Sequence, residues 1–433
     1  MERYMGFAGI AALIALCLLC SERRARFPWR VVIVGIALQF FIAWLLLRFG
    51  PVATLFDLLG RAINNVIACA DAGSNFLFGA LADPSGTPWG FVFAVRVLPV
   101  IVFFAALMSV LYHLGIMQRI VAALAWVLRR TLRVTGVEAM VVAANIFVGQ
   151  TEAPLCIRPY IPHLTRSQLA TLMVGGFATM AGSVMASYVT LLGGSDPTAP
   201  ERVLFAKHLL TASVISAPAA FVCSKIIVPE TDSPFDVTRI RGPERATRNL
   251  FDAAAAGATD GLRLALNVAA MLVAFVSLLA LVDMGLRAVG GIGFVHDALA
   301  RVGVETLSLE LILGFALAPL ARLIGIPWSE CAAFGSLLGK QVVVTEFLAY
   351  QSLAADIHSE TPKLSPRSWQ IATYALCGFA NFPSIAIQIG GLGALAPSRR
   401  AELASLGLRA MLGGAFACWM TACVAGILLP PDP

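Results

Sequence analysis

Apolar runs separated by short polar segments extend along the whole chain, and this pattern predicts helices that cross a membrane. Several runs reach about 20 residues, the length that a helix needs to span the hydrocarbon core of a bilayer. The predicted spans are residues 5–20, 31–49, 91–113, 168–192, 203–228, 262–286, 369–394 and 405–428. The sequence therefore predicts an all-α polytopic membrane protein with eight transmembrane helices.

The pattern changes at residues 139–155, where an apolar run leads directly into an amide, a hydroxyl and a carboxylate. Gly149 and Pro154 flank these polar residues, and both residue types loosen or break a regular helix. We therefore predict a re-entrant hairpin over 137–164 with Glu152 at its polar tip. A carboxylate at membrane depth costs about 2.5–3.5 kcal/mol and marks a candidate functional site. The alternative interpretation is an ordinary loop beside a short core helix.

The second half of the chain repeats the order of elements in the first half. Thr-Glu recurs at 345–346 in a second predicted hairpin over 327–352, and Gly-Phe-Ala recurs in the span after each hairpin. Glycine and proline interrupt both of these spans, 168–192 and 369–394, which frees backbone carbonyls for ligands or ions. Each half holds three spans, an odd number, so the two copies are expected to have opposite orientations. Inverted repeats with broken helices are typical of secondary transporters.

The predicted organisation contains a scaffold, two repeats and a connecting loop. We expect an N-terminal scaffold at 1–90, a first repeat at 91–228, a cytoplasmic loop at 229–261 and a second repeat at 262–433. Residues 55–70 and 116–133 are predicted to lie in the membrane interface, because each mixes apolar residues with charged ones. The helix predicted at 308–325 is ambiguous, since Pro319 interrupts an apolar length that would nearly span.

Composition supports a membrane protein over a soluble one. Hydrophobic residues make up 59% of the 433 residues and charged residues only 13%, with a mean hydropathy of +0.83. The nine cysteines are scattered, and no spacing among them resembles a zinc or redox site. The formal net charge of +6 is explained by arginines in the loops, so no nucleic acid is expected as a partner.

Arginine placement predicts which loops face the cytoplasm. With eight spans, the odd-numbered loops carry most loop arginines: Arg23, Arg24, Arg26, Arg30, Arg119, Arg129, Arg130, Arg133, Arg158, Arg166, Arg239, Arg241, Arg245, Arg248, Arg399 and Arg400. We therefore expect the odd loops in the cytoplasm and both termini in the periplasm, with the protein in a bacterial inner membrane. Arginines follow the first apolar run directly, so that run is expected to remain as a span.

The two hairpin tips supply Glu152 and Glu346, which are expected to face each other across the repeat interface. Such a pair can form a metal site, act as an acid and a base, or accept hydrogen bonds from hydroxyl groups. No histidine or third carboxylate converges with them and no nucleophile has an adjacent base, which disfavours a transition-metal site and an enzyme. Gln150 and Asn381 can donate and accept hydrogen bonds, and Phe379 offers a flat apolar face. This set suits an uncharged, polyhydroxylated solute.

Five motifs in order resemble the concentrative nucleoside transporter family. They are Gly-Gln-Thr-Glu-Ala-Pro-Leu at 149–155, Thr-Glu-Phe-Leu-Ala-Tyr at 345–350, Ala-Thr-Tyr-Ala-Leu-Cys-Gly-Phe-Ala-Asn at 372–381, Ala-Pro-Ser-Arg-Arg at 396–400 and Met-Thr-Ala-Cys at 420–423. The resemblance covers essentially the whole chain. It implies a homotrimer in the lipid bilayer that imports nucleosides by alternating access, coupled to a sodium gradient. Proton coupling and a nucleoside sensor without transport remain alternatives, and an intramembrane enzyme ranks below them.

The resemblance also implies roles for individual residues. The nucleobase would contact Gln150, Thr151 and Glu152. The ribose hydroxyls would be held by Glu346, Asn381 and Ser384, with Phe379 packing beside the nucleoside. Sodium would be held by Asn145, Val148, Ser183 and Val184, the two valines through their backbone carbonyls. Oxygen ligands of this kind suit a hard cation. The alternative for the asparagine is that its amide satisfies a freed carbonyl at the tip.

Three positions depart from the family pattern. The second tip usually carries Lys and Asn where this chain has Gln341 and Thr345, and Pro383 stands where Ser is common. All three lie on the expected ribose side, so they bear on sugar affinity and tolerance. Gln150 can satisfy the edge of a purine or of a pyrimidine, so both nucleoside classes stay open.

Overall fold

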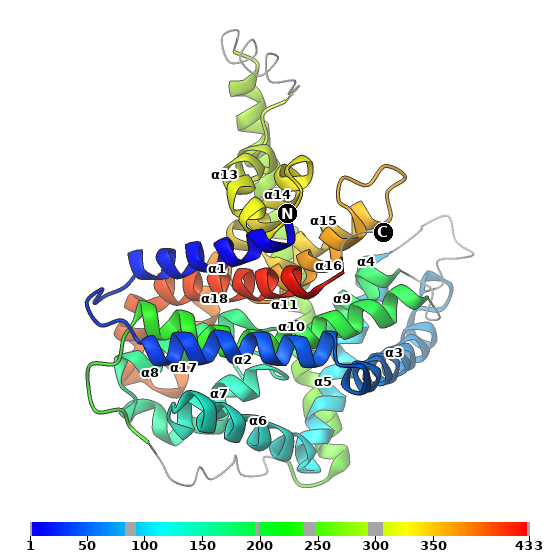
Figure 1. Cartoon of the computed structure of the whole chain (residues 1–433). Coiled ribbons are helices and arrows are strands. Elements are labelled where there is room, and N and C mark those ends of the chain that lie inside the picture. Colours follow the sequence, from blue (N-terminus) through cyan, green and yellow to red (C-terminus); the bar gives the residue numbers. More distant parts are fainter. Residues whose placement is uncertain (1, 83–91, 195–198, 237–246, 293–305, 431–433) are drawn as a thin grey trace.

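The fold is helical throughout the part of the chain that the structure describes. The structure is a computed structural model, and it describes residues 2–82, 92–194, 199–236, 247–292 and 306–430. Within these ranges every regular element is an α-helix or a 3₁₀-helix, and none is a strand. The prediction of an all-α protein is confirmed (Figure 1).

The elements follow one another as helices of very different length. In the first half they are α1 (Glu2–Leu19), α2 (Trp29–Leu47), α3 (Gly50–Phe78), η1 (Gly79–Ala82), α4 (Phe93–Arg96), α5 (Leu98–His113), α6 (Ile116–Leu132), α7 (Gly136–Asn145), η2 (Ala153–His163), α8 (Arg166–Ala178), α9 (Gly182–Gly193) and α10 (Pro200–Ile227). In the second half they are α11 (Leu250–Gly290), α13 (Leu309–Ile324), η3 (Trp328–Glu330), α14 (Cys331–Val343), α15 (Glu346–Ile357), α16 (Pro366–Ala375), α17 (Phe382–Leu395), η4 (Pro397–Arg399) and α18 (Arg400–Leu428).

The core is built from α8, α9, α10 and α18. About nine-tenths of the residues in their apolar windows are buried, against 28% in α1 and α2 and 6% in α11. Figure 1 shows α1, α18, α10 and α2 side by side, while α11 runs steeply across them. The close packing of α18 on α8 depends on Gly414, because a Cβ there would collide with Phe177. The polar residues of the core therefore lie inside a shell of apolar helices.

Two long helices are interrupted inside this core. The first stops at Ala178 and restarts at Gly182, and the second stops at Ala375 and restarts at Phe382. At the second break, Asn381 is extended and its Oδ1 accepts a hydrogen bond of 2.8 Å from the backbone N–H of Ser384, which caps α17. Pro383 lies in the first turn of α17, where a missing N–H costs nothing.

Two helix pairs fold back on themselves at the positions of the predicted hairpins. In the first, α7 packs against η2, a 3₁₀ segment that holds Pro159 and Pro162. In the second, α14 packs against α15, and Thr345 caps α15 by accepting a hydrogen bond from the N–H of Leu348. The first tip is tied to the first break, since the N–H of Gly182 donates to the carbonyl of Phe147 at 2.9 Å.

The structure differs from the predicted spans in the helix that follows α2. Residues 55–70, predicted to lie in the interface, belong to the 29-residue helix α3, which is long and apolar enough to cross a membrane. Residues 369–394, predicted as a span that glycine and proline interrupt, are divided between two helices of 10 and 14 residues, in agreement with the predicted break. Among the described residues, eight helical stretches have the length and hydropathy of a span, but they include α3 and omit 369–394. Charged residues along α3 interrupt its apolar pattern, so the sequence did not indicate the full length of this helix.

The described parts of the odd-numbered loops meet at one end of the molecule. Arg166 forms ion pairs with Glu22 at 2.7 Å and with Glu402 at 3.9 Å. Arg129 forms one with Asp236 at 3.2 Å. These contacts join the segment after α1 to the first turns of α8 and α18, and the last turn of α6 to the segment after α10. Which side of the membrane this end faces remains a prediction from the arginine distribution.

Candidate substrate and ion site

A cavity of about 590 Å³ lies where both hairpin tips meet both helix breaks. Its lining includes every residue predicted to bind substrate: Gln150, Thr151, Glu152, Glu346, Phe379, Asn381 and Ser384. They come from three segments, the first tip, the second tip and the second break, and Ala181 and Val184 of the first break complete this part of the lining. The structure thus brings the predicted set together, and the wall opposite these segments comes from α11.

Glu346 is held by hydrogen bonds to both of its carboxylate oxygens. The Nδ2 of Asn381 donates to Oε2 at 2.6 Å, and the hydroxyl of Tyr188 donates to Oε1 at 3.0 Å. All three side chains are buried. An ionised carboxylate has about four acceptor positions, so two hydrogen bonds fix its orientation and leave capacity for a ligand hydroxyl.

Tyr188 was not identified from the sequence. It lies in α9, where it reads as one more large residue of an apolar helix. Its ring stacks on Tyr350 with 4.1 Å between ring centroids, and this stacking directs its hydroxyl toward Glu346. The hydroxyl of Tyr350 instead donates to the backbone carbonyl of Thr373 at 2.9 Å. The two tyrosines therefore have different polar partners despite their contact.

Gln150 is oriented by a second residue that sequence reasoning did not assign, Gln388. The Nε2 of Gln388 donates to the Oε1 of Gln150 at 2.9 Å and to the carbonyl of Met173 at 3.0 Å. This close approach requires Gly176, because a Cβ there would lie 2.6 Å from the Nε2 of Gln388. With its oxygen engaged, Gln150 presents its N–H₂ group as a donor.

Glu152 has a different environment from Glu346. Glu346 is 6% exposed, whereas Glu152 and Thr151 are exposed at the cavity surface. Asp260, Arg263 and Asn267 of α11 line the same cavity. The sequence analysis did not assign these three residues, although their spacing of three and four places them on one helix face.

The four predicted ion-binding residues are buried around the contact between the first tip and the first break. Asn145 is 1% exposed, Val148 6%, Ser183 7% and Val184 2%. Among the described residues, neither amide atom of Asn145 has a hydrogen-bond partner. A buried amide without partners is costly, and a cation would satisfy its oxygen. The donor set of an amide, a hydroxyl and backbone carbonyls therefore fits a hard cation such as sodium.

Gln341 lies outside the substrate cavity. Its Oε1 accepts a hydrogen bond of 3.3 Å from the Nε1 of Trp419, and its Nε2 donates to the carbonyl of Gly378 at 3.5 Å. These bonds connect the second hairpin to α18 and to the second helix break. The neighbouring Lys340 points elsewhere and pairs with Glu310 at 3.0 Å. Thr345 lines the cavity and also caps α15. Of the positions that differ from the family pattern, it is therefore the one whose side chain can contact a ligand directly.

Family models match most of the chain. The model of the Na⁺-dependent nucleoside transporter N-terminus matches residues 8–81, and that of its C-terminus matches residues 208–426. A nucleoside-recognition Gate model matches residues 94–195. The chain belongs to the Na⁺-dependent, or concentrative, nucleoside transporter family. Proteins of this family are described as nucleoside transporters.

Named relatives agree with this family. Solute carrier family 28 member 3 of Rattus norvegicus is 39% identical over 440 residues, which cover 99% of this chain and 59% of that protein. Sodium/nucleoside cotransporter 1 of Mus musculus is 37% identical over 447 residues, covering 99% of this chain and 64% of that protein. The chain therefore spans about three-fifths of the length of these mammalian relatives.

Solved structures share the fold over the whole chain. The structure of CNTnw in an inward-facing substrate-bound state has a TM-score of 0.89 at 38% identity, and the match covers 99% of this chain and 98% of that one. An outward-facing state of a CNTnw variant matches with a TM-score of 0.88, at the same identity and coverage.

Proposed function

We propose that this chain is a symporter that imports nucleosides across a bacterial cytoplasmic membrane, driven by a sodium gradient. One observation carries the proposal: the cavity at the two tips and two breaks gathers carboxylates, amides and an aromatic face beside a buried, unpartnered Asn145. Such a lining suits a polar, uncharged solute with both a flat base and a sugar.

We assign the two sides of the cavity to different parts of the nucleoside. Glu346, Asn381 and Ser384 hold the ribose hydroxyls, since the first two are already oriented by their mutual hydrogen bond. On the other side the nucleobase meets the polar tip of the first hairpin, Gln150, Thr151 and Glu152. Phe379 packs against the nucleoside. No residue in this set favours purines over pyrimidines.

Coupling follows from the position of the ion-binding residues. Asn145 and Val148 belong to the same hairpin as Gln150, while Ser183 and Val184 begin α9. A bound sodium ion supplies positive charge to their oxygens. The tip is then ordered against the first break, and this fixes the residues that read the base. By linkage, nucleoside and sodium raise each other's affinity by the same factor.

Transport requires the site to open alternately to the two sides of the membrane. We infer that the two halves form inverted repeats, with re-entrant hairpins at 137–164 and 327–352, and that the site lies where they meet. The family resemblance extends this to a homotrimer. The exposed apolar surface of α11 is available for contact with lipid or with neighbouring protomers. With the odd loops in the cytoplasm, both termini are periplasmic.

Uptake by proteoliposomes tests the proposal. We expect the purified chain to accumulate labelled uridine when an inward sodium gradient is imposed. A proton-coupled symporter would accumulate uridine under a pH gradient with choline in place of sodium. A sensor would bind uridine without accumulating it, and an enzyme would return an altered nucleoside. Each of these three results would replace the proposed function with the corresponding alternative.

A further inference from the structure

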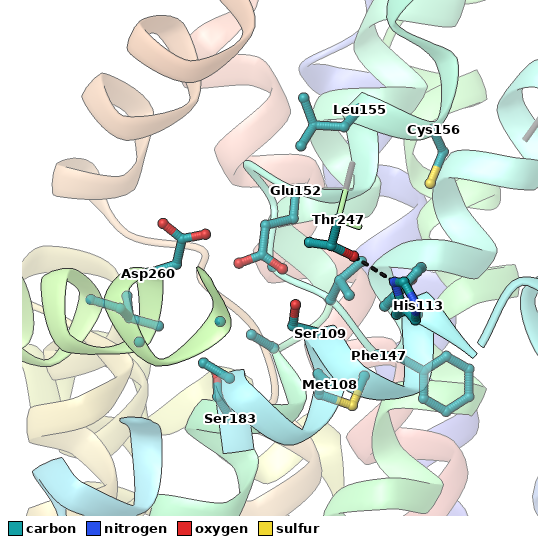
Figure 2. Close-up of a pocket in the computed structure, with 18 of the residues that line it drawn as sticks. Met108, Ser109, His113, Phe147, Glu152, Leu155, Cys156, Ser183, Thr247 and Asp260 are labelled. Carbon is teal, nitrogen blue, oxygen red and sulfur yellow. Dashed lines mark hydrogen bonds between the residues drawn. The ribbon is translucent and has the colours of Figure 1, made fainter. Parts of the chain in front are cut away.

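A second cavity, of about 270 Å³, adjoins the nucleoside cavity (Figure 2). It lies between the first hairpin and the helices α5 and α11. The two cavities share Gly149, Glu152, Ala181, Asp260 and Leu264 in their linings. Glu152 and Asp260 are the charged residues of this shared boundary.

The second cavity reaches the ion-binding residues from the side away from the nucleoside. Val148 and Ser183 line it, whereas Val184 lines the nucleoside cavity. Asn145, with its unpartnered amide, belongs to the same hairpin as Val148. The proposed ion site therefore lies in the wall of the second cavity, and an ion can enter there without passing through the bound nucleoside.

The charge of the second cavity favours cations. Glu152 and Asp260 are both exposed, and Figure 2 shows their carboxylates directed into the same space above Ser109 and Ser183. Arg263 pairs with Asp260 at 3.8 Å but lines only the nucleoside cavity. An exposed pair one helical turn apart contributes little to stability, so stability alone does not explain the presence of Asp260 and Arg263 at this position of α11.

We propose that the second cavity is the path by which sodium reaches and leaves its site, with Asp260 attracting the cation at the boundary. This inference rests on the proposed sodium coupling and deepens it. The field of Asp260 raises the local sodium concentration, and the field of Arg263 lowers it. Neutralising these two neighbours is therefore expected to shift sodium affinity in opposite directions, which a merely structural ion pair would not do.

Sodium titrations of uridine binding test the path on the full chain in detergent. Choline replaces sodium so that ionic strength stays constant. We expect Asp260→Asn to raise the half-saturating sodium concentration about three- to tenfold, and Arg263→Gln to lower it. Because both residues also line the nucleoside cavity, uridine affinity is measured separately at saturating sodium, where an effect on the field that acts on the ion no longer limits binding. Glu360→Gln, which removes an exposed acid in a distant loop, serves as the matched control.

Three results would overturn the inference. Unchanged sodium affinity in Asp260→Asn would show that this carboxylate does not attract the ion on its path. Equal shifts in the same direction for both variants would mean that the ion pair acts structurally. A loss of uridine affinity at saturating sodium would assign Asp260 to the nucleoside instead. Failure of the proposed function is distinguishable, because the wild type itself would then bind uridine equally well in choline.

Discussion

The Nδ2 atom of Asn381 donates a hydrogen bond of 2.6 Å to the Oε2 atom of Glu346, which joins the second helix break to the tip of the second hairpin. The other end of the same amide caps α17 through the N–H of Ser384. One asparagine thus ends one element and orients the charged group of another. The carboxylate of Glu346 is therefore already oriented before a substrate hydroxyl binds to it. Binding then costs little conformational entropy for this side chain.

Glu346→Gln and Asn381→Ala are expected to weaken uridine uptake severely while the protein remains folded. Each removes one partner of a buried polar group, which typically costs about 1–3 kcal/mol, or roughly 5- to 150-fold. Labelled uridine uptake in proteoliposomes measures the loss, and size-exclusion chromatography checks the fold. Near-normal uridine affinity in both variants would place the substrate elsewhere.

The stacked tyrosines provide a matched pair of variants. Tyr188→Phe removes the hydroxyl that donates to Glu346, whereas Tyr350→Phe removes one that donates to the backbone of Thr373. We expect Tyr188→Phe to weaken uridine binding by about fivefold, as for the loss of one hydrogen bond of about 1 kcal/mol. Tyr350→Phe should lower thermal stability and leave uridine affinity unchanged. Equal affinities in the two variants would contradict a role for Tyr188 in orienting Glu346.

Asn145→Ala is expected to abolish the dependence of uridine binding on sodium. The wild type should bind uridine more tightly in sodium than in choline, because ion and nucleoside order the same hairpin. In Asn145→Ala, the uridine affinity measured in sodium should fall to the affinity measured in choline. Asn75→Ala, on the exposed surface of α3, is the control. A variant that keeps the full sodium response would show that Asn145 only satisfies the hairpin backbone.

Topology is tested by labelling at Ser233, an exposed position in the segment after α10. The native Cys69 is exposed and is first replaced by serine. Ser233→Cys should resist an impermeant thiol reagent in intact cells and react after the membrane is opened. Ready reaction from outside would invert the predicted orientation and contradict the arginine assignment of the odd loops.

The ion pair between Glu22 and Arg166 predicts a pH-dependent contribution to stability at the end where the odd loops meet. The hydrogen bond from Arg166 lowers the pKa of Glu22 below its ordinary value of 4.5. A lowered carboxyl pKa adds stability that is complete above the unfolded-state pKa and is lost as pH falls through the folded-state pKa. Glu22→Gln should therefore melt at a lower temperature than the wild type at pH 7, and the two should converge in acid. A constant difference at all pH values would exclude the ion pair as its cause.

Much of the fold and of the site was predictable because the signals are local. Apolar runs of membrane length indicated helices, and the polar residues between Gly149 and Pro154 indicated a functional tip, since few other roles justify a carboxylate there. The recurrence of Thr-Glu led to Glu346 in the same way. Each of these inferences uses residues within one segment, and the resemblance then supplied the roles.

Only the tertiary structure decided which residues orient those at the tips. Tyr188 is 158 residues from Glu346, and Gln388 is 238 residues from Gln150, so no periodicity could pair them. The same holds for Asp260, whose position beside Glu152 depends on the crossing of α11 over the first hairpin. The sequence by itself determined the helices and the polar tips, because burial in a membrane constrains every residue of a segment. The partners of those tips were decided by packing between segments, which composition and spacing do not encode.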